Sequence, residues 1–416
     1  MALLKRYTQQ YAALWILLLA VVSHSFTLPP PTVVAQRAEG IAYSYSFGQI
    51  ATFSLTFSQG LPSAEAQLYI RISDAGQEYT KMYPVPTQDG QASFDRDLRE
   101  NPFPPFSRIS FWWEYPSDQG KTYETETTTF LYEDNRFRWQ IIQEENITIH
   151  WVTGEDALML SAMDIARASV HEIQNAFQAP TIDPVSIYIY PSLADLQSAL
   201  RLAGQSWVGG EAHPDVSVVL LAISPSREAV LEMERDIPHE LAHVLLHRIT
   251  GPEGYKNLPT WMTEGLATYF ERRPEAAYAL ALQKARTEGS LIPLEHLCGI
   301  FPAEHEQAVL AYAESQSVVT YLQRTHGWSR IRALLEAYSD GLGCSEGLKR
   351  ALGIDLPTLE RDWRVWLEQE GRPMDSTQRI WTIAVVLLRD IAPWLIVSSV
   401  LLLPGFLSLV ASRPKG

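Results

Sequence analysis

Residues 41–134 are dominated by an alternation of apolar and polar positions with a period of two. Such alternation is typical of short strands that bury one face. The sequence Ser117-Asp118-Gln119-Gly120 predicts a hairpin turn before a final strand at 122–132, which is rich in Thr and aromatic residues. We therefore expect an all-β, immunoglobulin-like sandwich over residues 36–134. The runs that carry the pattern are residues 43–47, 53–57, 68–72 and 109–115.

The period changes after residues 135–140, where we place a domain boundary. Residues 155–177 carry apolar side chains at helical spacing, and strands and helices then follow one another. Strands interleaved with helices, followed mostly by helix, predict an α+β domain over residues 135–370. The other predicted strands are 147–152, 185–190 and 216–222, and the other predicted helices are 193–202, 331–338 and 348–366.

An apolar run near the N-terminus, residues 11–22, follows Lys5 and Arg6. A basic start, a short apolar run and small residues at 33–35 predict a secretory signal peptide over residues 1–35. An uncleaved membrane anchor is the alternative, although the run is short for a membrane span.

A second apolar run, residues 391–411, carries no charge and is long enough to cross a bilayer. We expect a transmembrane helix there, preceded by a linker at 371–390 and followed by a tail at 412–416. Arg413 and Lys415 place that tail in the cytoplasm by the positive-inside rule. The body of the protein would then lie outside the cytoplasm, anchored to the cell membrane.

Charge and cysteine content narrow the possible partners and the compartment. The formal net charge of -15 argues against a nucleic-acid partner, because phosphate binding needs a basic surface. The two cysteines, Cys298 and Cys344, are too far apart in sequence for a zinc motif. In an oxidising compartment they would form a disulfide worth roughly 3–4 kcal/mol, and two separate buried thiols are the alternative.

The strongest chemical motif is His239-Glu240-Leu241-Ala242-His243, an HExxH pattern. Residues four apart on a helix share one face, so both imidazoles can reach a single ion. Zinc in a catalytic site takes a third protein ligand and leaves one position open for water. Glu240 is then the candidate general base. The helix either begins near Pro238 with Asp236 as its cap, or continues from residues 226–235 with a kink.

The third ligand decides the class of zinc site. Metzincins use a Gly and a further His at positions that hold Leu246 and Ile249 here, which excludes that class. Three histidines along one helix rarely reach a single ion, so His247 is expected beside the site or on the surface. Glu264, 21 residues after His243, is the better candidate, and a solvent-facing acid is the alternative. A loop at 251–257 would turn the chain back, and Gly265 would let the second helix approach the first.

The two motifs together, His239-Glu240-x-x-His243 and Trp261-Met262-Thr263-Glu264-Gly265-Leu266-Ala267, resemble those of the gluzincins. These are the thermolysin-like and aminopeptidase-like zinc peptidases, and the bacterial peptidase MA-like domain proteins are the most similar group. The resemblance implies a zincin-like catalytic domain and one zinc ion held by His239, His243 and Glu264. In the aminopeptidase branch a downstream Tyr donates to the developing oxyanion, and Tyr312 stands in a similar segment. A buried aromatic is the alternative role for Tyr312.

Two features depart from that family pattern. The aminopeptidases carry a GAMEN segment that grips the substrate amine, and the corresponding residues here are Gly209-Gly210-Glu211-Ala212. Thermolysin-like enzymes have an Asp four residues after the Glu ligand, where this chain has Thr268. The partner of the ligating histidines is therefore not identified from the sequence. The strand at 216–222 is expected to be the edge against which an extended peptide pairs.

These patterns predict a membrane-anchored, extracytoplasmic zinc peptidase that acts on a peptide or protein substrate. A zinc-activated water, with Glu240 as general base, would hydrolyse the peptide bond. The sequence leaves the endo- or aminopeptidase mode open. The alternative is a non-catalytic surface-binding or scaffold protein built on a zincin fold.

Overall fold

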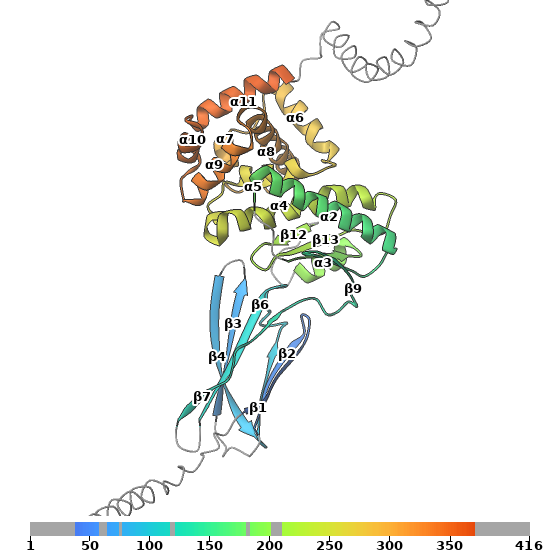
Figure 1. Ribbon diagram of the computed structural model, residues 1–416, viewed down its shortest axis with the longest axis vertical. Helices are drawn as coiled ribbons and strands as arrows, with labels where there is room; N and C mark the ends of the chain where they lie inside the picture. Colours follow the sequence, from blue (N-terminus) through green and yellow to red (C-terminus); the bar gives the residue numbers. More distant parts are fainter. Residues whose placement is uncertain are drawn as a thin grey trace, which may run out of the picture. The chain divides into compact units, whose positions relative to one another are not determined.

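The computed structural model describes residues 38–57, 65–74, 77–116, 121–179, 184–200 and 210–370 (Figure 1). The chain divides into two compact units. One comprises Met1–Gln140 and Ser192–Gly209, and the other comprises Ile141–Pro191 and Gly210–Gly416. The predicted signal peptide and the predicted membrane span at 391–411 both lie outside the described residues. Among the residues that are described, no helix is both long and apolar enough to span a bilayer.

The first unit is built on an eight-stranded antiparallel sheet rather than the expected immunoglobulin-like sandwich of two sheets. Its strands pair in the order β1-β2-β5-β4-β3-β6-β7, and β8 also pairs with β6. The strands are β1 (Ala38–Ser46), β2 (Ile50–Phe57), β3 (Glu65–Asp74), β4 (Gln77–Gln88), β5 (Gln91–Asp97), β6 (Arg108–Pro116), β7 (Thr122–Glu124) and β8 (Thr128–Leu131). The predicted strand at 122–132 is thus two short strands, and the predicted turn at 117–120 lies outside the described residues.

Strand β4 explains why the sandwich prediction was wrong. It is 12 residues long and pairs with β3 from Gln77 to Pro86. Its last residues, Thr87 and Gln88, pair with β5 instead. One strand therefore belongs to both halves of the sheet, which makes a β half-barrel. Alternation in the sequence shows that each strand buries one face, but it does not show which strands share hydrogen bonds.

The two halves of the half-barrel enclose an aromatic core. Phe53 on β2 meets Phe111 on β6 edge to face, with ring centroids 4.9 Å apart. Tyr43 on β1 stacks on Phe130 on β8 at 4.1 Å. Offset and edge-to-face pairs at these distances add to the gain from burying apolar surface. The period-two pattern therefore identified the buried residues of β2, β3 and β6, whereas Tyr43 on β1 is 40% exposed.

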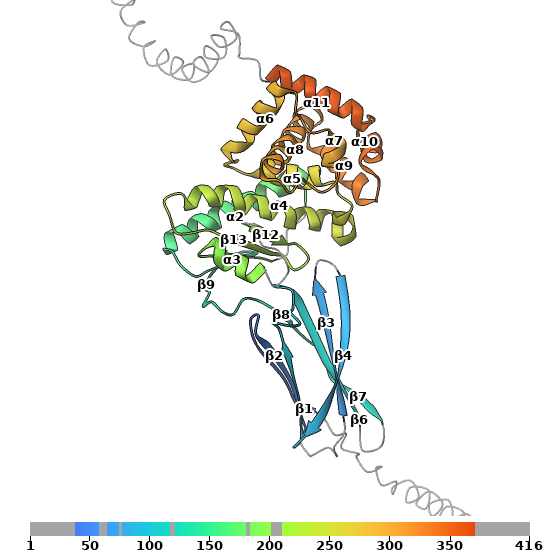
Figure 2. The same ribbon diagram turned by 180° about the vertical axis from the view of Figure 1, so that it is seen from behind.

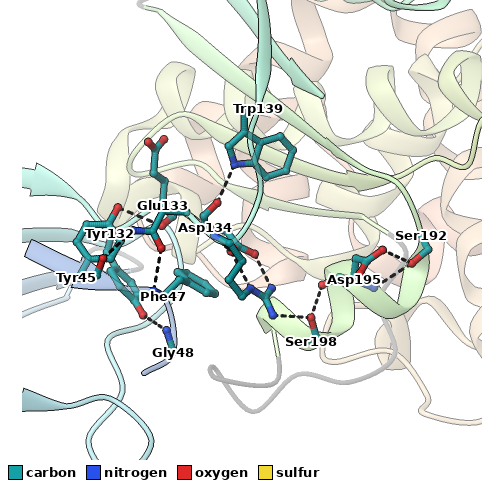
Figure 3. A network of polar contacts seen from close by, with 12 residues as sticks. Tyr45, Phe47, Gly48, Tyr132, Glu133, Asp134, Trp139, Ser192, Asp195 and Ser198 are labelled. Carbon is teal, nitrogen blue, oxygen red and sulfur yellow. Dashed lines mark hydrogen bonds and ion pairs between the residues drawn. The ribbon is translucent and has the colours of Figure 1, made fainter. Parts of the chain in front are cut away.

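A polar network ties the end of the sheet to α3 (Leu193–Leu200) within the first unit (Figure 3). The Gly48 amide donates to the Tyr132 hydroxyl at 2.6 Å, and the Trp139 indole donates to the Asp134 carbonyl at 2.8 Å. Arg136 pairs with the buried Asp134 carboxylate and also donates to the Ser198 hydroxyl at 3.0 Å. These bonds satisfy groups that would otherwise be costly to bury.

The second unit contains a five-stranded sheet in the order β12-β13-β11-β10-β9. Strands β10, β11 and β13 run parallel, while β12 pairs antiparallel with β13. The predicted edge strand at 216–222 is therefore an inner strand, because β12 covers its outer side. The sequence prediction missed β12, which is only four residues long. The strands are β9 (Gln140–Glu144), β10 (Ile147–Trp151), β11 (Val185–Tyr190), β12 (Gly210–His213) and β13 (Val218–Ala222).

Helices α2 and α4 lie across this sheet, and helices α5 to α11 gather beyond them (Figures 1 and 2). The predicted helix at 155–177 is confirmed as α2, and the predicted helix at 348–366 is instead two helices separated after Gly353. The helices are α2 (Asp156–Phe177), α4 (Ala229–Lys256), α5 (Thr260–Phe270), α6 (Ala276–Glu288), α7 (Leu294–Leu297), α8 (His305–His326), α9 (Trp328–Ser339), α10 (Cys344–Leu352) and α11 (Leu356–Glu370).

Helix α4 runs from Ala229 to Lys256 and contains Pro238 in its interior. Asp236 is therefore not its N-cap, and the continuous helix is the correct alternative. Gly251, with φ 75° and ψ 165°, interrupts the helix before its last turn. A glycine is suited to this position because the left-handed φ is costly for other residues. The predicted loop at 251–257 is mostly this last turn.

Cys298, at the end of α7, forms the predicted disulfide with Cys344, the first residue of α10. The Trp261 indole on α5 donates to the Cys344 sulfur at 3.4 Å. The cross-link and this contact therefore bring three helices of the second unit together.

Gly265 has a different partner from the one we expected. A Cβ atom at this position would lie 2.6 Å from the Ser315 carbonyl oxygen and 2.8 Å from its carbon. Ser315 belongs to α8, so the glycine allows α5 to approach α8 rather than α4. The residue next to Glu264 is thereby pressed against the backbone of a third helix.

We expect Gly265→Ala to destabilise the protein by about 1–3 kcal/mol, because α5 and α8 must separate to admit the methyl group. Gly299→Ala is a matched control, since nothing lies within 4 Å of a Cβ there. Urea unfolding followed by circular dichroism measures both variants. Equal midpoints for the two variants would contradict the close packing at Gly265.

Candidate metal centre

Helices α4 and α5 bring the three predicted ligands together. One donor atom each from His239, His243 and Glu264 lies within 4.8 Å of the others. Glu264 Oε2 is 3.5 Å from His239 Nε2 and 3.6 Å from His243 Nε2. The two imidazole rings are 5.1 Å apart, as expected for residues one turn apart on a helix. The side chains are only 12–19% exposed, so the three donors form a largely buried cluster.

The outer nitrogens of both histidines are occupied by other side chains. His239 Nδ1 lies 2.8 Å from Glu271 Oε1, and His243 Nδ1 lies 3.0 Å from the Tyr255 hydroxyl. In the neutral form that binds a metal, a proton at Nδ1 leaves the lone pair of each Nε2 toward Glu264. Two imidazole nitrogens and one carboxylate oxygen converging in this way fit a site for a single metal ion.

Glu271 is the histidine partner that the sequence left unidentified. It follows the last residue of α5 and lies seven residues, or about two turns, after Glu264. Its side chain is only 2% exposed. The expected position, Thr268, is buried instead, and its carbonyl accepts a hydrogen bond from Gln316 at 3.2 Å. Two turns of spacing from the Glu ligand is the sequence signal that could have pointed to Glu271.

Glu240 lies beside strand β12. A Cβ atom at Gly210 would be 2.9 Å from Glu240 Oε1, so the glycine leaves room for this carboxylate. Burial raises the pKa of Glu240 to about 8, and the nearby Glu264 and Asp236 carboxylates act in the same direction. When it is ionised, a carboxylate with a raised pKa is a stronger proton acceptor than an ordinary Glu, which suits a general base.

The protonation of the cluster suits a cation, although His239 must lose a proton. Burial lowers the pKa of His243 to about 4, so this ring is neutral. Burial opposes charge on Glu264, but both histidines and the Tyr312 hydroxyl outweigh it and lower the pKa of Glu264. For His239 burial is likewise outweighed, by hydrogen bonds to Glu264 and Glu271, and its pKa is raised. Metal binding at His239 therefore releases a proton.

Tyr312 on α8 stands at the edge of this cluster. Its ring centroid is 6.2 Å from that of His239, and its hydroxyl is close enough to Glu264 to lower the pKa of that carboxyl. Tyr278 stacks on one side at 6.2 Å, and Phe301 meets the ring edge to face at 5.3 Å. The structure thus places Tyr312 at the candidate site, with a hydroxyl that reaches a ligand.

His247 does not join the cluster. Its ring lies edge-on to that of Tyr255, with centroids 5.5 Å apart, and the side chain is half-buried. This agrees with the expectation that it lies beside the site or on the surface.

A separate apolar groove of about 830 Å³ lies between α6 and α8. Its lining includes none of the three candidate ligands. The groove comes near Tyr312 through Val309 and Leu310 on the same helix and through Ala277, Ile300 and Pro302, which are chain neighbours of Tyr278 and Phe301. The chemistry of the metal cluster and the volume of this groove are therefore separate features of the second unit.

Residues 165–369 match the family described as the Peptidase MA superfamily. No curated protein matches the chain. Two similar solved structures are an aminopeptidase N family protein from Idiomarina loihiensis and an aminopeptidase A from Legionella pneumophila. The first has 11% identity and a TM-score of 0.37, covering 78% of this chain and 76% of the other. The second has 9% identity and a TM-score of 0.35, covering 76% of this chain and 47% of the other. The family match supports a peptidase domain in the second unit.

We expect Glu271→Gln to weaken metal binding by about 10- to 100-fold, because the charge that supports His239 is lost while the side-chain shape is kept. Competition with a chromophoric chelator measures the affinity. Glu275→Gln is the control, since this acid is exposed at the start of α6. An unchanged affinity in Glu271→Gln would show that the carboxylate does not support the site.

Proposed function

We propose that this chain is a zinc-dependent peptidase whose metal is held by His239, His243 and Glu264. The observation that carries the proposal is the convergence of two Nε2 atoms and one carboxylate oxygen beside Glu240. Two His and one Glu, with a position left for water, are a ligand set found in catalytic zinc sites. When bound, zinc supplies Lewis acidity that polarises a carbonyl and lowers the pKa of water.

Glu240 is the proposed general base. It takes a proton from the attacking water as the water oxygen bonds to the peptide carbonyl carbon. It then returns the proton to the nitrogen when the C–N bond breaks, so that one water is consumed for each bond cleaved. The position of Glu240 next to the ligand His239, with Gly210 leaving room for its carboxylate, supports this role, and its raised pKa makes the ionised carboxylate a stronger proton acceptor.

Tyr312 is the proposed donor to the carbonyl oxygen as negative charge develops on it. Its hydroxyl already reaches Glu264, which supports a position at the ligand cluster. A donor held in place before the reaction stabilises the developing charge without reorganisation.

Strand β12 is the proposed edge for the substrate, in place of the inner strand at 216–222. It is the outer strand of the described sheet, and Gly210 on it lies against Glu240. An extended peptide added to this edge would run past the proposed base. The backbone would then provide affinity while the side chains provide specificity.

We also propose that the catalytic body is extracytoplasmic and anchored in the membrane. The uncharged run at 391–411, followed by Arg413 and Lys415, supports this placement. The Cys298–Cys344 disulfide also supports it, since such bonds persist in oxidising compartments.

Glu240→Gln tests the chemistry directly. We expect hydrolysis of a peptide library to fall by about 10²- to 10⁴-fold, because Gln cannot accept the proton. Zinc content, measured by elemental analysis, should stay at one ion per chain. Glu253→Gln, an exposed acid in the last turn of α4, is the control. Retained hydrolysis in Glu240→Gln would disprove the base, and a zinc-loaded parent that cleaves nothing would favour the scaffold alternative.

For Tyr312→Phe we expect kcat to fall by about 10²- to 10³-fold with little change in KM, because a donor to the transition state is lost. Tyr321→Phe, on the same helix, is the control, since its ring packs against His326 and Trp366. Rates are compared per bound zinc ion. A variant that loses zinc but keeps its rate per ion would make Tyr312 a support for Glu264 instead.

A further inference from the structure

Tyr255 contacts the candidate ligand His243 on the side away from the other ligands. Its hydroxyl lies 3.0 Å from His243 Nδ1, on the opposite side of the ring from Nε2. We infer that Tyr255 is a positioning residue that fixes the tautomer and the ring orientation of His243. This inference rests on the proposed metal site and adds a residue that the motif spacing does not reveal.

The tautomer argument follows from the donor and acceptor roles of a neutral imidazole. One ring nitrogen carries the proton and the other carries the lone pair. When Nδ1–H donates to the Tyr255 oxygen, the lone pair is left on Nε2, which lies 3.6 Å from Glu264 Oε2. The hydrogen bond also limits rotation of the ring about its bond to Cβ. Tyr255 therefore does for His243 what the Glu271 carboxylate does for His239.

The last turn of α4 brings Tyr255 back to the site. The interruption at Gly251 redirects the backbone one turn before Tyr255. Gly254 is buried against α9, where a Cβ would lie 2.9 Å from Ser339 Cβ. Asn257 donates to the Ser339 carbonyl at 3.1 Å on the other side of Tyr255. The residues flanking Tyr255 are thus held by α9, so its hydroxyl does not depend on a free loop for its position.

His247, the third histidine of helix α4, also contributes to this arrangement. It lies one turn after His243 on α4, and its ring packs edge-on against the Tyr255 ring at 5.5 Å. His247, which does not reach the metal cluster, therefore supports Tyr255, which orients His243. This contact accounts for the His239, His243 and His247 series without assigning three ligands from one helix.

The test compares Tyr255→Phe with Tyr269→Phe, which removes a hydroxyl from a ring packed on Phe270 and Trp328. Zinc affinity is measured by chelator competition, and the visible absorption spectrum is recorded after substitution with Co²⁺. We expect Tyr255→Phe to lose about 10- to 100-fold in affinity and to change the Co²⁺ spectrum. The Tyr269→Phe control should match the parent in both. Affinity within twofold of the parent and an unchanged spectrum in Tyr255→Phe would overturn the inference.

A measurement on the parent protein keeps the inference testable if the variant fails to fold. Nitrogen-15 NMR of the histidine side chains in the zinc-loaded protein distinguishes the protonated nitrogen from the metal-bound one. We expect His243 to carry its proton on Nδ1 and the ion on Nε2. The opposite assignment would overturn the role of Tyr255, whereas a parent that binds no zinc would reject the proposed function itself.

Discussion

The close contact between α5 and α8 at Gly265 is the constraint on which the candidate site depends. Ser315 lies so near that no side chain fits, and Glu264 is the preceding residue on the same helix. This packing fixes the position of Glu264 relative to the histidines of α4. Because α8 also carries Tyr312, the same contact brings the tyrosine hydroxyl to Glu264. Close-packed interiors transmit such shifts, so a displacement at Gly265 would also move Glu264, Tyr312 and the two ligating histidines.

The electrostatics of the site favour a bound cation. Glu240, Glu264 and Glu271 are all largely buried, and the nearby groups that offset their charge are His239, which has a raised pKa, and Arg235 beside Glu271. Burying a carboxylate is costly unless it is paired, and the raised pKa values of Glu240 and Glu271 reflect that cost. A divalent ion at the cluster would offset much of this charge. The residues that disfavour the metal-free site are the same residues that would provide chemistry once a metal is present.

The metal ligands and the residues that contact them differ in how well local sequence patterns predicted them. The HExxH spacing was enough to place His239 and His243 on one face, because helix geometry alone determines it. Glu264 needed a tertiary assumption, namely that α5 returns to α4. Glu271 and Tyr255 were missed because each depends on how a helix ends: Glu271 follows the end of α5, and Tyr255 follows the interruption at Gly251. The short strand β12 was missed for a similar reason, since four residues carry too little periodicity.

The sequence by itself determined what local periodicity and covalent spacing can encode. That includes most of the strand faces of the first unit, the α+β character of the second and the histidine pair, whereas the pairing of Cys298 with Cys344 was settled by the structure. Only the tertiary structure decided which strands share hydrogen bonds, because β4 pairs with neighbours on both halves of the sheet. It also decided the partners of Gly265, His239 and His243. Contacts between segments far apart in the chain depend on packing and chain reversal, and no short window of sequence contains that information.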